Sequence, residues 1–548
     1  MDTVYQGLEE KGYLVLVLHG HQPFVHHPDI EYPIEEEWLY ETQTDCYLPL
    51  IHVCQELLNE GIRSKLTFSL SPTLCMMLSD GYRQSRYIRH LDERITFLES
   101  KVKLKGDIGL DDDLGFWYCK RFAKCCRAME DESGGNIIAN FRRLQEQQAI
   151  SIIASAATHA YLPLWELYPD IVNLQIELGI QQYIRDFGNK PTGFWLPECG
   201  YFKGLDKFLR HQQINYFFLS QHGVLNGDPV PTYGEFATVQ TPNGVMAFAR
   251  DVFIDHQVCF KKIGYPGDPL YADFHSDIGL IWPSESVREL THNDGPATTG
   301  IRCYRDGSVA LQERYNPETA EIRCELHAAH FVDQCQRRVA MLNETLGRKP
   351  IITGLFDMEH FGHWWLEGPS WLKHVIRKLS CESSTVKIIT ADEYLTLCPE
   401  SEIVRPSMSS WGYQGYSETW LMGRNDWIYP AVFKAINAFR ELMANDEQPN
   451  GLRQVALNQY LRELLLAQSS DWAFIMHAQT AAEYATQRVK GHLANMSRIQ
   501  FGLEENSLDP YWLASLQQKN NIFADIDLLE HYRKCDSTTK KEKKTYVP

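Results

Sequence analysis

No stretch of this 548-residue sequence approaches the roughly 20 apolar residues in a row that a membrane-spanning helix requires. The first eleven residues are acidic, and the apolar stretch after them is too short for the core of a signal peptide. The 14 cysteines include no CxxC pair and show no repeated spacing, which favours reduced thiols over a disulfide framework or a zinc knuckle. We therefore expect a cytoplasmic protein with no membrane partner.

Positive charge is also scarce. The chain has 53 Lys and Arg residues against 71 Asp and Glu residues, a formal net charge of -18. This balance argues against a nucleic-acid partner, because phosphates need compensating cations. The 44% apolar content is ordinary for a globular protein with a sizeable core, and the length allows two to four domains or one large barrel with additions.

Short apolar runs bounded by polar residues, Gly or Pro predict eight strands. These strands are expected at 13–18, 65–70, 150–156, 192–196, 215–219, 245–249, 351–356 and 386–389. Helical stretches lie between many of them, and such alternation is typical of a parallel sheet. The number of units favours an α/β fold of the (β/α)-barrel type over a doubly wound sheet of six strands.

The domain organisation follows from changes in composition along the chain. Residues 1–400 are expected to form the catalytic barrel, interrupted by a helical insertion at 71–149. Residues 221–300 are rich in Gly, Pro, Asp and Tyr, and a long loop region of this kind is usually functional, so we expect a lid there. A helical C-terminal domain is expected at 401–530, followed by a disordered, lysine-rich tail at 531–548.

The segment FDMEHFGHWW at 356–365 is the most informative part of the sequence. It follows an expected strand, where a barrel enzyme places catalytic side chains. Asp357 comes first and Glu359 two residues later, so both carboxylates point inward or one of them fixes a histidine such as His360. Trp364 suits a stacking surface for a sugar ring, although a core position is the alternative.

Four further polar side chains follow expected strands. His19 and His21 stand two residues apart after the first strand, and His159 holds the same place after the third. They could bind a metal, donate hydrogen bonds to a polar substrate, or serve the structure of their loops. Glu198 ends an almost wholly apolar strand, so it should be either catalytic or paired with a neighbouring cation.

Aromatic residues also gather beyond the expected barrel. Residues 409–416 are aromatic and poor in aliphatic side chains, and both Trp411 and Trp420 suit a stacking surface better than a core. Asp471 and Trp472 interrupt two expected helices. A role at the site and simple capping of the next helix are equally consistent with their position.

Two classes of function remain after this reading. The first is a carbohydrate enzyme that uses Glu198 and Asp357 as its carboxylate pair. The second is a metal-dependent barrel hydrolase, because histidines after the first strand and an aspartate after a late strand also occur in metal-binding barrels. The aromatic content of 12%, with 13 Trp and 27 Tyr, favours the first class.

At these residues the chain resembles glycoside hydrolase family 57, and within it the α-glucan branching-enzyme subgroup. Five ordered segments carry the resemblance, which covers roughly residues 13 to 500. They are HGHQP (19–23), ATHAYLP (157–163), WLPECGY (195–201), FDMEHFGHWW (356–365) and SSWGYQG (409–415). The GYPGDP stretch at 264–269 is also typical of the subgroup.

The resemblance implies a (β/α)7 barrel with an inserted helical subdomain and a C-terminal helical domain. It implies retention of anomeric configuration with no metal and no cofactor. Glu198 would be the nucleophile and Asp357 the general acid/base. The remaining expected substrate-binding residues are His19, His21, His159, Tyr233, Trp282, Glu359, His360, Trp364, Trp411, Trp420, Asp471 and Trp472.

The activity implied is cleavage of α-1,4 bonds in an α-glucan and transfer to a 6-hydroxyl, which makes α-1,6 branches. A 4-α-glucanotransferase or an α-amylase of the same family is the alternative. The family's branching enzymes carry a lid loop with a tyrosine near its tip, and Tyr233 takes that place here. Phe236 stands where a second tyrosine is expected, which leaves the balance between transfer and hydrolysis open.

Overall fold

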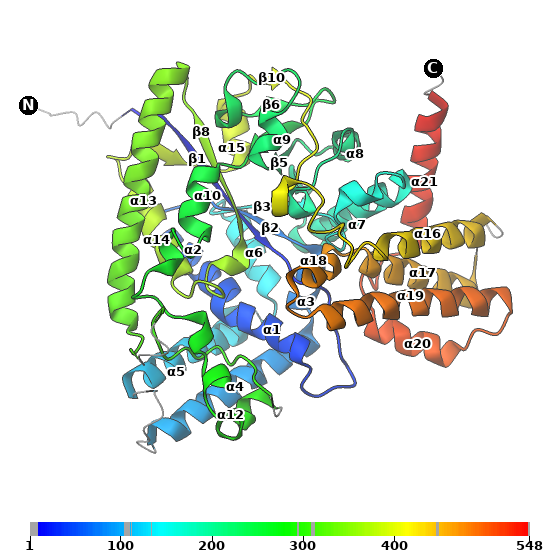
Figure 1. The fold of residues 1–548 in the computed structure, drawn as a ribbon, viewed down its shortest axis with the longest axis horizontal. Coiled ribbons are helices and arrows are strands. Elements are labelled where there is room, and N and C mark those ends of the chain that lie inside the picture. Colours follow the sequence, from blue (N-terminus) through cyan, green and yellow to red (C-terminus); the bar gives the residue numbers. More distant parts are fainter. Residues whose placement is uncertain are drawn as a thin grey trace, which may run out of the picture.

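The computed structural model describes residues 9–103, 110, 112–132, 134–292, 295–307, 313–444 and 449–545. Its centre is a largely parallel sheet wrapped by helices, and a group of helices from the C-terminal part of the chain lies to one side (Figure 1). Within the described residues, no helix is both long enough and apolar enough to cross a membrane.

The sheet has the strand order β10-β6-β7-β5-β4-β3-β2-β1-β8, and β9 also pairs with β1. The strands are β1 (Gly12–Gly20), β2 (Thr67–Leu70), β3 (Ser151–Ser155), β4 (Gly193–Trp195), β5 (Tyr216–Leu219), β6 (Val239–Gln240), β7 (Met246–Ala249), β8 (Ile351–Asp357), β9 (Val386–Ile388) and β10 (Glu402–Ile403). All pairings are parallel except that of β6 with β7.

A backbone hydrogen bond links β8, at one end of this sheet, to the segment that follows β7. The amide of Asp251, two residues beyond β7, donates to the carbonyl of Thr353 in β8 at 2.8 Å. The seven parallel strands β8, β1, β2, β3, β4, β5 and β7 therefore curve into a barrel. The expected (β/α)7-type fold is confirmed.

The interior of the barrel is filled by alternate residues of the strands. Tyr13, Val15 and Val17 of β1 belong to the same buried cluster as Leu355 of β8 and Trp195 of β4. Because side chains alternate along a strand, the next interior position of β1 is His19, and that of β8 is Asp357. These two residues are partners in the register of β1 and β8, so they meet at the carboxyl rim.

The outer helices cover the strands as in other barrels. They are α1 (Ile34–Thr42), α2 (Leu48–Asn59), α7 (Pro169–Phe187), α8 (Leu205–His211), α9 (Gln221–Leu225), α10 (Val252–Cys259), α13 (Pro317–Leu346), α14 (Gly368–Leu379) and α15 (Ala391–Leu397). Gly179 allows α7 to lie directly on β3, since a Cβ there would come within 1.9 Å of the Ser155 carbonyl oxygen.

The expected insertion is helical, with α3 (Pro72–Leu78), α4 (Gly81–Lys103), α5 (Asp112–Arg127) and α6 (Ile137–Glu146). The 221–300 region differs from the expected lid. It contains the barrel strand β7 as well as α11 (Ile278–Ile281) and α12 (Ser284–Thr291), and α12 packs on α4. Much of this region is therefore part of the scaffold.

The C-terminal helices are α16 (Ile428–Ala444), α17 (Gly451–Ala467), α18 (Ser470–Ala478), α19 (Ala482–Glu504), α20 (Pro510–Lys519) and α21 (Leu528–Thr545). The junction of α17 and α18 rests on the barrel mouth (Figure 1). There the Ser470 amide donates to the His159 carbonyl, and the Thr158 hydroxyl donates to the Leu465 carbonyl at 2.6 Å. The helical domain is thus built into the mouth of the barrel.

The expectation of a disordered tail from 531 onward is wrong for the described residues. Helix α21 packs against α7, and Leu528, Leu529, Tyr532 and Cys535 are buried. The Tyr532 hydroxyl donates to the Asp170 carboxylate of α7 at 3.1 Å. The lysines dominate the composition of this segment and hide the short apolar stripe that holds it in place.

Removal of residues 528–548 should therefore destabilise the protein. Each large buried side chain contributes roughly 1.5–3 kcal/mol to the free energy of unfolding, so the loss should be several times that of a single core truncation. Thermal melting is the measurement, and truncation after Ser537 is the control because it keeps all four buried side chains. Equal melting temperatures for the two truncations would show that α21 contributes no packing energy.

Candidate active site

Glu198 lies at the carboxyl end of β4 in a strained backbone conformation. The backbone φ angle of Glu198 is 61° and that of Cys199 is 50°. Both lie in the left-handed region, which residues other than Gly rarely adopt. Strain of this kind costs of the order of 1–3 kcal/mol per residue and occurs where function fixes a side chain. The turn directs the carboxylate into the cleft rather than along the strand.

Two donors from distant parts of the chain hold the Glu198 carboxylate. The Trp411 indole Nε1 donates to Oε2 at 2.7 Å, and the Ser470 hydroxyl donates to Oε1 at 2.8 Å. The Trp411 backbone amide also donates to the Glu198 carbonyl at 3.0 Å. Both carboxylate oxygens therefore have fixed positions.

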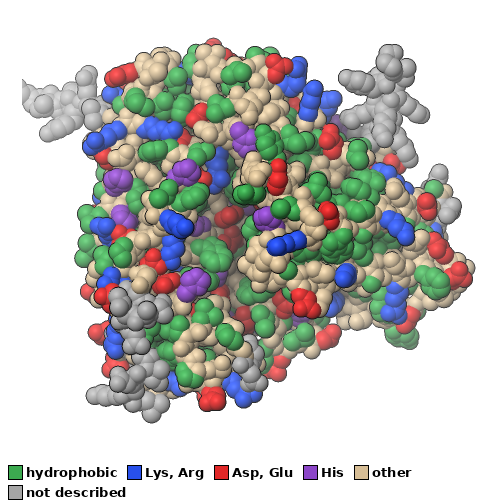
Figure 2. All heavy atoms as spheres, in the orientation of Figure 1, with side chains coloured by type: hydrophobic (Ala, Val, Ile, Leu, Met, Phe, Trp, Pro, Cys, Tyr) green, Lys and Arg blue, Asp and Glu red, His purple; other side chains and the backbone are tan. Residues whose placement is uncertain are grey.

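Asp357 faces Glu198 from the end of β8. Both side chains line one cleft of about 470 Å³, and the charge of Asp357 raises the pKa of Glu198. Asp357 is exposed to this cleft, whereas the six preceding residues of β8 are buried. A hollow near the middle of the face in Figure 2 has acidic side chains in its depth.

Partial removal from bulk water, deep in the cleft, raises the pKa of both acids. Desolvation is the main cause for Glu198, whose pKa is about 7, although the hydrogen bonds from Trp411 and Ser470 oppose it. Desolvation likewise raises the pKa of Asp357 to about 6, against the opposing charges of Arg250 and His21. Each carboxyl group can therefore exchange a proton near neutral pH, which suits acid/base chemistry.

Three histidines form a stack next to Glu198, where His159 Nδ1 lies 3.8 Å from the Glu198 carboxylate. The rings of His19 and His159 lie 4.9 Å apart, those of His21 and His159 3.8 Å, and His19 also stacks on Trp195 at 4.6 Å. Their nitrogens are occupied: His19 Nε2 is 2.8 Å from His159 Nε2, and His159 Nδ1 is 2.8 Å from the Ser470 hydroxyl. Burial lowers the pKa values of His19 and His159, so both are neutral.

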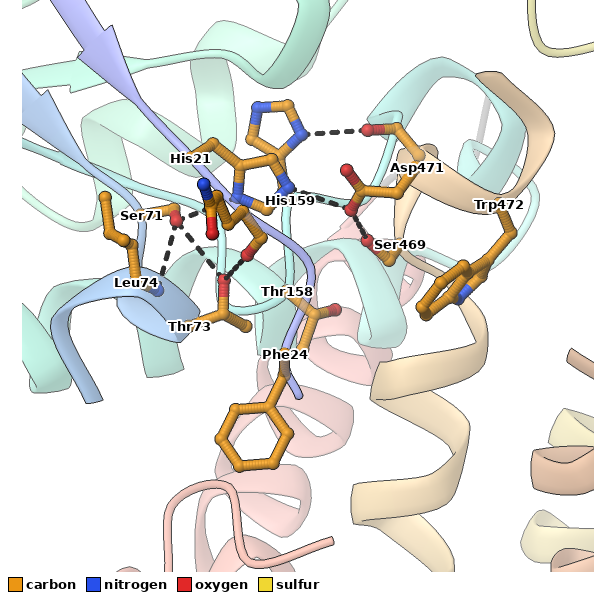
Figure 3. A network of polar contacts seen from close by, with 12 residues as sticks. His21, Phe24, Ser71, Thr73, Leu74, Thr158, His159, Ser469, Asp471 and Trp472 are labelled. Carbon is orange, nitrogen blue, oxygen red and sulfur yellow. Dashed lines mark hydrogen bonds and ion pairs between the residues drawn. The ribbon is translucent and has the colours of Figure 1, made fainter. Parts of the chain in front are cut away.

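His21 is the exception in this stack (Figure 3). Its Nε2 lies 2.8 Å from the Asp471 carboxylate and its Nδ1 lies 2.8 Å from the Ser71 hydroxyl. Burial acts to lower the pKa of His21, but Asp471, Glu359 and other acids outweigh it and raise that pKa. The surrounding carboxylates therefore favour the protonated form of His21 over the neutral imidazole.

The pKa values of Asp471 and Glu359, the two acids around His21, are shifted in opposite directions. The attraction of His21 overcomes desolvation and lowers the pKa of Asp471 to about 2, and Ser469 donates a further hydrogen bond to it. Desolvation raises the pKa of Glu359 to about 7, while the Tyr47 hydroxyl donates to it at 2.6 Å. Glu359 also accepts from the His21 backbone amide at 3.0 Å, so it positions the histidine loop.

Aromatic rings form the walls of the cleft. Trp411 and Trp420 line one side, and Trp420 is almost wholly buried, stacked on Tyr161 at 4.2 Å. Trp364 lies on the cleft with 57% of its surface exposed, and its ring is tilted by 37° against that of Phe274 at a centroid distance of 4.8 Å. His360 also lines the cleft and is fixed by the Val258 carbonyl at 2.8 Å.

Three expected site residues lie elsewhere. Trp472 is 1% exposed, and its indole donates to the Leu466 carbonyl inside the helical domain. Trp282 ends α11 and packs against the core without lining the cleft. Tyr233 makes a cation–π contact with Arg348, and Phe236 makes one with Arg338 of α13. Arg348 stands just before β8, and Asp357 stands at the other end of that strand, so Tyr233 is far along the barrel from the site. The 228–238 loop is therefore no lid in this structure, because cation–π contacts hold it beside α13.

Several cleft residues were not expected from the sequence. Arg250 directly follows β7, pairs with Asp255 at 2.5 Å and covers the Trp411 ring at 5.2 Å. Glu198 was expected because it follows a predicted strand, and the same argument applies to Arg250, which directly follows the predicted strand at 245–249. Ser470 and Phe474 come from α18, a helix of another domain, so no local pattern indicates their role.

Among the described residues, no group of three or more His, Cys, Asp or Glu side chains could hold a metal ion. The close contact of His19 Nε2 with His159 Nε2 turns these nitrogens toward each other. The described part of the chain thus offers no ligand set for the metal-dependent alternative.

Comparison with known proteins identifies the class to which this fold and site belong. The model for glycosyl hydrolase family 57 matches residues 15–407, and a model for the C-terminal region of 1,4-α-glucan branching enzymes matches residues 431–531. The chain belongs to glycosyl hydrolase family 57.

Individual relatives cover almost the whole chain. The α-amylase AmyC of Thermotoga maritima is 34% identical with a TM-score of 0.88, over 95% of this chain and 99% of that one. A branching enzyme of this family from Pyrococcus horikoshii is 30% identical with a TM-score of 0.85, over 95% and 97%. The 1,4-α-glucan branching enzyme of Thermococcus kodakarensis is 29% identical over 94% of this chain and 78% of its own length.

Replacement of Arg250 by Gln should raise the pKa of Asp357 above about 6, because the Arg250 cation favours the charged carboxylate. If Asp357 acts as the acid, the alkaline limb of the pH–rate profile for glycosidic cleavage should move to higher pH. Arg250→Lys should restore much of the original profile.

The matched control for this experiment is Arg377→Gln, which removes an arginine that pairs with Glu60 outside the cleft. An unchanged alkaline limb in Arg250→Gln, with the protein folded by thermal melting, would show that Arg250 does not control the acid.

Proposed function

We propose that this protein is a 1,4-α-glucan branching enzyme that works by a retaining mechanism. The observation that carries the proposal is the pairing of Glu198 and Asp357 in one aromatic cleft at the carboxyl rim of a family 57 barrel. The match of residues 431–531 to branching-enzyme C-terminal regions supports it, since this segment delivers Ser470 to Glu198.

In the proposed mechanism, Glu198 attacks the anomeric carbon of an α-1,4-linked glucan. Its carboxylate is oriented for this step by Trp411 and Ser470. Asp357 donates its proton to the leaving 4-oxygen, and a glycosyl-enzyme ester forms at Glu198. Asp357 then takes the proton of the 6-hydroxyl of a second glucan as that oxygen displaces Glu198. An α-1,6 branch results, with configuration retained.

The residues around the two acids have supporting roles in this scheme. The stack of His19, His21 and His159 forms the floor of the sugar subsite. The cation on His21 stabilises the carboxylate form of Glu198 as it departs. Exposed rings of the cleft walls, Trp364 above all, offer flat surfaces to the glucan chains.

A second candidate is hydrolysis, which would make the protein an α-amylase. The placement of Tyr233 beside Arg348 favours it, because no tyrosine of that loop covers the cleft to keep water from the glycosyl-enzyme. The likeness to the Thermotoga maritima α-amylase points the same way.

We also propose that the protein works in the cytoplasm on a storage-type α-glucan. None of the 14 cysteines, each of which the structure describes, forms a disulfide, and burial raises the pKa of twelve of the thiols. Thiols that stay protonated and form no disulfide suit a reducing compartment.

Incubation with amylose should separate the two activities. A branching enzyme should produce α-1,6 linkages, which a debranching enzyme converts to short linear chains, with little gain in reducing ends beforehand. An α-amylase should release reducing ends and leave no material that debranching shortens. Products without any α-1,6 linkage would overturn the branching proposal while leaving the carboxylate pair intact.

Replacement of Glu198 by Gln should abolish turnover and preserve the fold. The amide is isosteric but cannot form the glycosyl ester, so the rate should fall by about 10⁴-fold or more. Single-turnover cleavage is the assay, and Glu393→Gln, which alters a carboxylate paired with Lys65 outside the cleft, is the control. A Glu198→Gln protein with a tenth of the original rate would assign the nucleophile to another residue.

A further inference from the structure

A second cavity lies between the turn at residues 26–27 and helices α19 and α20, and it shares no lining residue with the catalytic cleft. Its volume is about 310 Å³, within the ~300–1,000 Å³ typical of small-ligand sites. The lining residues are His26, His27, Gln487, Arg488, Gly491, His492, Asn495, Trp512, Ser515, Leu516, Lys519 and Asn520.

The walls of this cavity are rich in hydrogen-bonding groups, but their charges are balanced. The cations Arg488 and Lys519 line it. Two carboxylates lie directly behind its histidines: Glu35 is 3.5 Å from His27 Nε2, and Glu463 is 2.7 Å from His492 Nδ1. A neutral polar ligand fits such surroundings better than an anion does.

The state of the histidines leads to the same conclusion. The Glu463 carboxylate accepts from His492 Nδ1, so the proton of this imidazole is on Nδ1. Burial lowers the pKa of His492, which leaves Nε2 as a bare acceptor, and Nε2 has no hydrogen-bond partner in the structure. His26 is also neutral, since burial lowers its pKa to about 4. Two neutral imidazoles in the wall suit a neutral polar ligand better than an anion.

Gly491 keeps this cavity open. It stands in the interior of α19, where glycine is less favourable than alanine. No positive φ requires it, and a Cβ built there would have no heavy atom within 4 Å, so close packing does not require it either. The absence of a side chain at 491 leaves free space beside His492.

We propose that this cavity is a second glucan-binding site that holds a glucosyl unit away from the catalytic cleft. Trp512 supplies an aromatic ring, which Arg498 covers at 4.0 Å. The amide NH₂ groups of Gln487, Asn495 and Asn520 donate to Glu483 and Glu463, and their amide oxygens can accept hydrogen bonds from hydroxyl groups. The choice of a glucan as ligand rests on the proposed function.

The cavity is connected to the catalytic histidines through Arg488. This guanidinium lines the cavity, donates to the Phe24 carbonyl at 2.9 Å and covers the Trp472 ring at 4.8 Å. Phe24 follows His21 by three residues, and Trp472 follows Asp471. In Figure 3, Trp472 lies next to Asp471, and Phe24 lies further from the His21–Asp471 pair. A glucan bound here would hold the polymer close to the catalytic site.

Affinity electrophoresis through amylopectin tests the proposal. The background is Glu198→Gln, which leaves the polymer intact. Gly491→Tyr fills the cavity and should weaken binding about tenfold, a change of ~1.4 kcal/mol. Gly491→Ala, the matched control, should bind as the parent does. In the active enzyme, Gly491→Tyr should leave turnover of short maltooligosaccharides unchanged.

The outcomes separate this proposal from the proposed function. If the Glu198→Gln parent itself shows no retardation by amylopectin, the proposed function fails. If the parent is retarded and Gly491→Tyr is retarded equally, only the second site is overturned. Calorimetry with inorganic phosphate tests whether the cavity binds anions instead. If the parent binds phosphate and Gly491→Tyr does not, while both bind glucan equally, the cavity is an anion site and the proposal is overturned.

Thermal melting shows whether Gly491→Tyr is folded. If it is not, Trp512→Ala replaces it, because this ring is partly exposed and its removal opens rather than fills the cavity. The same weakening of glucan binding is expected, and retardation equal to that of the parent overturns the second site.

Discussion

The position of the Glu198 carboxylate depends on donors that stand 213 and 272 residues further along the chain. After β4, the backbone directs the Glu198 side chain by a left-handed conformation at Glu198 and Cys199, and this conformation lowers the stability of the fold. Trp411 offsets that cost with one backbone and one indole hydrogen bond, and Ser470 secures the other oxygen. The barrel alone therefore cannot form the site: the helical domain must dock before Glu198 is held.

The same docking organises the charges around the site. Asp471 arrives with Ser470 at the start of α18 and pairs with His21, which gives the histidine stack one charged member beside two neutral ones. Desolvation would otherwise favour a neutral imidazole at every position of the stack. The protonated form of His21 is favoured because the Asp471 carboxylate of the helical domain faces it. Domain packing and catalytic electrostatics are thus one constraint in this protein.

Much of the fold could be predicted because its signals are local. All eight expected strands are present within about two residues, since each is an apolar run bounded by polar residues or turns. Strands β6 and β10 were missed because two residues, as at 239–240 and 402–403, carry no periodicity. The α21 helix was taken for a tail because its lysines outnumber the few residues that anchor it.

The site could be predicted where it follows strands and not where helices supply it. Parallel strands end at one rim, so His19, Glu198 and Asp357 were expected together and are found together. Ser470 and Phe474 lie on a helix whose approach to the rim depends on tertiary packing alone. Tyr233 shows the opposite error, because turn-rich composition is the same for a lid and for a loop held by Arg348.

Because the expected lid loop does not cover the cleft, the proposed function needs another way to keep water from the glycosyl-enzyme, so that transfer is faster than hydrolysis. With the 228–238 loop held beside α13, water exclusion falls to the acceptor glucan itself and to the rings it covers. The exposed rings of Trp364, Tyr413 and Phe474 all line this cleft, and Trp364 packs against Phe274. An acceptor bound between these walls would desolvate the glycosyl-enzyme and present its hydroxyl in the same event. Transfer would then depend on occupancy of the cleft, so the ratio of branching to hydrolysis should rise with the concentration and length of the acceptor chain.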